Sequence, residues 1–167
     1  MPGASIILCN KLKNRHAYSK EFPFILLEML ATEPLRARML GIAAAWLADF
    51  GHTTGSLGVA RELLQHVLAV RADVLSNYRP FPPQEKQIGD ALWKWCDLVG
   101  STPMALPIVI ELIDIGLPST VEATKRAMDW LSRPDRGHTN SVWEALFDKV
   151  RRNHTARQVG AAGLEAL

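Results

Sequence analysis

The chain has 167 residues, of which 48% are hydrophobic and 22% are charged, and its formal net charge is +2. A chain of this length can form one domain with an apolar core that needs neither a metal nor a disulfide. The small net charge alone does not indicate a polyanionic partner, and the two cysteines lack the paired spacing of a zinc site or a disulfide framework.

The sequence has no segment with the features of a secretory signal or a membrane span. A membrane helix needs roughly 18–20 consecutive apolar residues, whereas the longest apolar runs, at 39–46 and 104–110, are shorter and are interrupted by glycine or proline. Thiols without disulfide spacing are typical of reducing compartments. We therefore expect an intracellular protein of the cytoplasm or nucleus, without a membrane span.

The first part of the chain combines an irregular arm with two short helices. Residues 1–18 have little periodicity, and we expect an N-terminal arm or a short helix there. Apolar residues at spacings of three and four then predict helices at 19–31 and 34–50. Each of these has a proline in its first turn, where the missing amide proton does no harm.

The longest helical pattern of the chain runs over residues 56–78. Ser56 is expected to cap its start, and Pro80 ends the pattern because it disfavours helical geometry at the residue before it. A helix of this length spans roughly 30 Å, so we expect the shorter helices to pack around it as a central element. Its apolar side consists of Leu57, Ala60, Leu64, Val67, Leu68, Val74, Leu75 and Tyr78.

Four further helices are predicted after a stiff, proline-rich linker at 79–83. Ser119 and Ser141 each precede a glutamate by three residues, which is the spacing of a capping box at a helix start. Residues 153–167 are rich in alanine and glycine, and we expect a flexible C-terminal tail there. The four helices are expected at 84–99, 102–115, 120–132 and 141–152.

These elements predict an all-α fold, because no strand alternation of useful length appears. We expect a compact bundle of about seven helices that forms a single domain over residues 19–152, with the 56–78 helix at its centre. Two apolar helices within 102–132 are joined by a short turn, and their packing is expected to resemble a HEAT-type hairpin. No second copy of this pattern follows at a period of about 40 residues, so a repeat array is not predicted.

The sequence lacks the residue patterns that catalysis or cofactor binding commonly requires. There is no nucleophile elbow, phosphate-binding loop, dinucleotide fingerprint or zinc-binding His-Glu-x-x-His motif. We interpret Glu62 and His66, four residues apart on one helix, as a surface pair. Glu111 and Asp114 are likewise interpreted as solvated carboxylates. We predict that the protein is not an enzyme and has no catalytic residue, cofactor or metal ion; an active site assembled from residues distant in sequence is the alternative.

An aromatic cluster within residues 78–93 indicates a binding surface. Trp93 and Trp95 are two residues apart on one predicted helix and so point in nearly opposite directions. If Trp95 lies on the side of this helix that faces the core, Trp93 either packs under a neighbouring helix or is exposed and anchors a contact with a partner. We predict that Tyr78, Phe81 and Trp93 bind another protein or a second copy of the chain, with a loop that folds over the core as the alternative.

Two basic clusters support a different hypothesis, nucleic-acid binding. They lie at 11–20, in the N-terminal arm, and at 149–157, at the end of the last helix. Together they would form a positive face for phosphates, although cations at a helix C-terminus also favour the helix dipole. Our first hypothesis is therefore a non-enzymatic helical interaction or assembly module, and nucleic-acid binding is the alternative. The residues expected to contact phosphates are Lys11, Lys13, Arg15, Lys149, Arg151 and Arg152.

Overall fold

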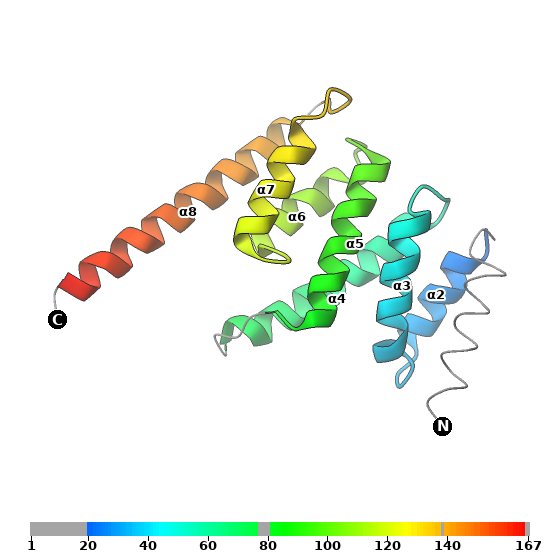
Figure 1. The fold of residues 1–167 in the computed structure, drawn as a ribbon. Helices are drawn as coiled ribbons and strands as arrows, with labels where there is room; N and C mark the ends of the chain where they lie inside the picture. Colours follow the sequence, from blue (N-terminus) through cyan, green and yellow to red (C-terminus); the bar gives the residue numbers. More distant parts are fainter. Residues whose placement is uncertain (1–19, 77–80, 138, 166–167) are drawn as a thin grey trace. The chain divides into compact units, whose positions relative to one another are not determined.

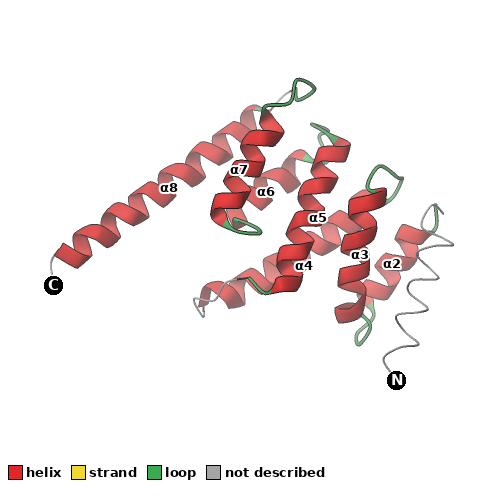
Figure 2. Ribbon diagram, in the orientation of Figure 1, coloured by secondary structure: helices red, strands yellow, loops and turns green. Residues whose placement is uncertain are grey.

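The computed structural model describes residues 20–76, 81–137 and 139–165. This part of the chain contains seven α-helices and no β-strand, so the predicted all-α class is confirmed. Figures 1 and 2 label these helices α2 to α8. The chain divides into two compact units, unit 1 (Met1–Gly100) and unit 2 (Ser101–Leu167). The sequence analysis placed no boundary at Gly100, where a positive φ of 67° ends the preceding helix.

Unit 1 is a four-helix arrangement in which two helices each contact the other three. These are α3 and α4, which pack on each other and on both α2 and α5. The contacts do not single out α4 as the centre, because α3 packs against just as many helices. The bounds are α2 (Phe22–Ala31), α3 (Arg36–Phe50), α4 (Ser56–Ser76) and α5 (Pro83–Val99). The predicted helix at 56–78 therefore matches α4 as far as residue 76, and residues 77 and 78 lie outside the described ranges.

The interior of unit 1 is built from large apolar side chains of all four helices. The ring of Trp46 lies 6.0 Å from that of Phe22 and 6.4 Å from that of Phe50, measured between centroids. Burying such rings is the dominant favourable contribution to helix packing. The largest fully buried side chains of the unit are Leu26, Leu30, Leu40, Trp46, Leu47, Leu63, Ile88, Leu92 and Trp95.

A buried hydrogen-bond chain joins α5 to the start of α4. The Trp95 Nε1–H donates to Ser56 Oγ over 3.0 Å, and the Ser56 hydroxyl donates to the Gly51 carbonyl over 2.6 Å. Ser56 is buried and is the first residue of α4, and its hydroxyl bonds to Gly51 and Trp95 instead of to an amide of the helix, as a cap would. A Cβ at Gly51 would lie 2.6 Å from Trp95 Cδ1, so only glycine lets the indole approach this turn.

Unit 2 consists of three helices, and α6 packs against both of the others. The bounds are α6 (Leu106–Ile115), α7 (Thr120–Leu131) and α8 (Asn140–Glu165). Gly116, with φ of 72°, ends α6, and Ser119 Oγ accepts the Glu122 amide at 3.2 Å, which confirms the predicted cap of α7. The core of unit 2 contains Ile108, Val109, Leu112, Ile113, Trp130, Val142 and Leu146.

Helix α8 differs from its predicted bounds at both ends. It begins at Asn140, so Ser141 lies inside the helix instead of capping it. It continues to Glu165, beyond the predicted end near residue 152, because good helix formers such as Ala156 and Gln158 follow without a proline. That residues 153–167 are flexible stays a prediction.

We predict that Ser56→Ala lowers the free energy of unfolding by about 1–3 kcal/mol, because it leaves the buried Trp95 N–H and Gly51 carbonyl without this partner. Chemical denaturation followed by circular dichroism measures the change. Ser132→Ala is the matched control, since that exposed hydroxyl bonds only to the local Asp129 carbonyl. Equal effects of the two substitutions would contradict the role given to Ser56.

Candidate functional site

The aromatic residues predicted to bind a partner do not form an exposed patch in the described structure. Trp93 is 3% exposed and belongs to the interior, so the interpretation in which it packs under neighbouring helices holds and the exposed contact anchor is wrong. Phe81 is half-buried, and Tyr78 lies outside the described residues.

Trp93 is buried together with Trp95 because α5 packs against both α3 and α4. These two helices cover a wider part of the α5 surface than the single inward-facing side expected from the sequence. Buried positions consequently extend over most of the circumference of α5, and charged residues such as Asp90 and Lys94 occupy the exposed remainder. The buried residues are Glu85, Ile88, Gly89, Ala91, Leu92, Trp93, Trp95 and Cys96.

The basic residues at 149–152, which lie within α8 and not at its end, are engaged with acceptors of unit 2. Arg151 lies 2.9 Å from Asp148 Oδ1, and Arg152 lies 2.8 Å from Asp114 Oδ1. Lys149 donates to the backbone carbonyl of Asp114. Lys11, Lys13 and Arg15, the predicted phosphate contacts of the N-terminal arm, lie outside the described residues. That the two basic clusters form one positive face therefore stays a prediction.

The predicted surface pair of Glu62 and His66 is replaced by two other pairs. Glu62 Oε1 accepts from Arg36 at 2.8 Å, and His66 Nε2 lies 3.0 Å from Glu85 Oε1. Glu85 is buried, and its second oxygen has no hydrogen-bond partner among the described residues. Within the described ranges, no group of three or more histidine, cysteine or acidic side chains is arranged to hold a metal ion.

Unit 2 carries an apolar surface that the sequence analysis did not identify. It consists of exposed apolar side chains of α7 and α8, among which Phe147 and Val121 are 66% and 74% exposed. The rings of Trp143 and Phe147 stack with centroids 5.8 Å apart and planes 26° apart. We call this surface the α7–α8 face and define it by Val121, Met128, Trp143, Phe147 and Val150.

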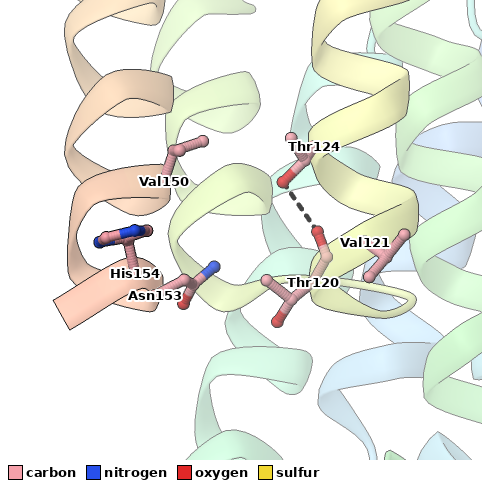
Figure 3. A pocket seen from close by; sticks show the side chains of 6 residues that line it. All are labelled: Thr120, Val121, Thr124, Val150, Asn153 and His154. Carbon is pink, nitrogen blue, oxygen red and sulfur yellow. Dashed lines mark hydrogen bonds between the residues drawn. The ribbon is translucent and has the colours of Figure 1, made fainter. Parts of the chain in front are cut away.

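A groove of about 290 Å³ lies within the α7–α8 face. Val150 and Asn153 of α8 point toward α7, whose Thr120 and Thr124 form the opposite wall, as Figure 3 shows. The Thr124 hydroxyl bonds to the Thr120 carbonyl at 2.9 Å, so that hydroxyl is already used inside its own helix. The lining is thus mainly apolar, with His154 and Asn153 as its polar side chains on α8.

The spacing of these residues explains how the face arises. Val142 and Leu146 are buried in the core of unit 2, whereas Trp143 and Phe147 follow each of them by one residue and therefore turn by about 100° around α8. Together with Val150, these four residues make the apolar side of α8 wide. The wide apolar side of α8 is in fact divided between a buried stripe and an exposed one.

Charged side chains on α7 lie close to the groove. Arg126 Nε donates to Glu122 Oε1 over 3.0 Å, one helical turn away. This hydrogen bond holds the pKa of the exposed Glu122 carboxyl below its usual value. Glu122 is therefore a carboxylate at neutral pH, near the N-terminus of α7 where a negative charge is favoured.

Comparison with known proteins gives no match: no family model fits the sequence, and no curated protein or solved structure matches it. Within the ranges that the structure describes, no helix combines the length and apolar character needed to cross a bilayer.

We predict that Trp93→Ala lowers the free energy of unfolding by about 3–5 kcal/mol, the usual range for removing a buried tryptophan from a packed interior. Thermal and urea denaturation measure it, with Leu98→Ala as the control because Leu98 is exposed on the same helix. A Trp93 variant as stable as the Leu98 variant would contradict the buried position.

Proposed function

We propose that this protein is a non-enzymatic helical interaction or assembly module whose docking surface is the α7–α8 face. The observation that carries the proposal is the exposed, stacked pair of Trp143 and Phe147 beside an apolar groove. Aromatic side chains that are exposed in the free protein and covered on association are typical of interaction hot spots. Clustered exposed apolar residues on one face favour a docking role over scattered surface contacts.

The size of the groove also favours a macromolecular partner over a small molecule. Sites for small ligands usually enclose about 300–1,000 Å³ and cover most of the ligand. The groove is at the lower end of that range, and the two aromatic rings lie outside its lining. An amphipathic helix would use both parts, since its apolar residues recur every three to four positions along a groove.

Burial of the exposed rings gives the expected strength of the contact. Covering one phenylalanine side chain contributes about 1.5–3 kcal/mol, which corresponds to roughly a 10- to 100-fold change in affinity. Phe147 should therefore be the position at which one substitution has a large effect on binding.

The same proposal includes the finer features of the fold expected from the sequence. Helices α6 and α7 pack on each other and are joined by the short turn 116–119, which supports a HEAT-type hairpin within 102–132. In unit 1, α4 packs on α2, α3 and α5, which supports a central position that α4 shares with α3. An intracellular setting is also proposed, and the burial of Cys96 in the core is consistent with it.

Nucleic-acid binding is the weaker alternative. Arg151 and Arg152 each face a carboxylate at hydrogen-bonding distance, so binding a phosphate would compete with an existing ion pair. Such binding would weaken steeply with added salt.

Affinity capture from the native cell, with nuclease treatment, tests the proposed function. The tagged chain is compared with Phe147→Ser and with Phe24→Ser, a matched substitution of an exposed phenylalanine in unit 1. We expect the wild type and the Phe24 variant to retain a stoichiometric protein, either another chain or an untagged copy of this one. The Phe147 variant should retain at least about tenfold less. Equal retention by both variants, or retention that nuclease abolishes, would contradict the proposal.

A further inference from the structure

We infer that a second copy of this chain binds the α7–α8 face, with the two α8 helices packed against each other in antiparallel orientation. This inference rests on the proposed function and names its partner.

The exposed side chains of α8 have the spacing of a helix–helix seam. Trp143, Phe147, Val150 and His154 follow one another at intervals of four, three and four residues. This alternation keeps one line of side chains directed at a partner helix. The first three are among the exposed apolar residues, and His154 is exposed as well, so the seam is accessible along these three turns.

Helix α8 is also much longer than the other two helices of unit 2. It has 26 residues, whereas α6 has 10 and α7 has 12. At about 1.5 Å per residue, α8 extends about 39 Å and α6 only about 15 Å. Figure 1 shows α8 continuing past the ends of both neighbours. A helix of this length has room for a partner helix of equal length along the exposed side that carries Trp143, Phe147 and Val150.

Charge complementarity selects a second copy in antiparallel orientation. Glu144 and Arg151 are seven residues apart and therefore lie on the same flank of the seam, and both are exposed. In an antiparallel pair centred near residues 148–149, Glu144 of each copy lies beside Arg151 of the other. In a parallel pair the equivalent flanks lie on opposite sides of the seam, so Glu144 of one copy would not meet Arg151 of the other.

The same arrangement places apolar residues opposite one another. Phe147 of one copy faces Val150 of the other, and this contact occurs twice about the two-fold axis. Trp143 faces the region of His154 at the two ends of the contact. Arg151 can meet the second copy while it remains close to Asp148, because a guanidinium has five donors. The seam thus pairs apolar residues with apolar residues at its centre and opposite charges on its flank.

Charge reversal at the two flanking positions tests the inference with the purified full-length chain. Glu144→Arg and Arg151→Glu each create two like-charge contacts in the pair, and we expect each to raise the dimer dissociation constant at least about tenfold at low salt. The double variant restores both contacts and should dimerise as the wild type does. Sedimentation equilibrium and light scattering measure the constants, and circular dichroism checks that the variants, changed only at exposed positions, are folded.

A mixture of the two single variants provides the sharpest readout. The Glu144→Arg chain then offers two arginines and the Arg151→Glu chain offers two glutamates, so the mixture should form a heterodimer more tightly than either variant forms a homodimer. A wild-type chain that stays monomeric at 100 μM would overturn the inference. So would a dimer whose affinity is unchanged by these substitutions and by Phe147→Ser.

These outcomes separate the inference from the proposed function. If the chain is monomeric but the α7–α8 face captures a different protein that Phe147→Ser releases, the inference fails and the proposed function stands. If the chain dimerises through other residues and Phe147→Ser affects no captured protein, both fail.

Discussion

Helix α6 determines the structure of unit 2, because it is the apolar element on which both other helices pack. Its ten residues include Ile108, Val109, Leu112 and Ile113, all buried. Since α7 and α8 each pack mainly on this short helix, their sides away from it receive little cover from one another. The groove and the exposed aromatic pair lie on these uncovered sides, where a partner can bind.

Much of the helical architecture was predictable from local signals. Proline at helix starts, glycine at helix ends and the Ser119 cap all act within a few residues, and the predicted helices correspond to α2–α8. The predicted helix ends were less accurate where the residues beyond them also favour a helix, as in the C-terminal part of α8. The boundary at Gly100 depends on which helices contact each other, and a single sequence does not contain that information.

The candidate site was not predictable in the same way, because exposure depends on how many neighbours a helix has. Helix α5 has two packing neighbours in unit 1, so Trp93 is buried beside Trp95. Helix α8 packs mainly on α6, so Trp143 stays partly exposed although it belongs to an equally apolar pattern. Spacing indicates which residues share a side of a helix, but it does not tell whether zero, one or two helices cover that side.

The division of the chain at Gly100 has a consequence for assembly. The proposed contact uses residues of unit 2 alone, so every joined pair carries unit 1 twice. A target with two suitably spaced sites for unit 1 would then bind both copies of unit 1. The second copy would bind at an effective concentration set by the chain segments that join the two copies, typically in the millimolar range. A weak individual affinity of unit 1 would become a durable association through avidity.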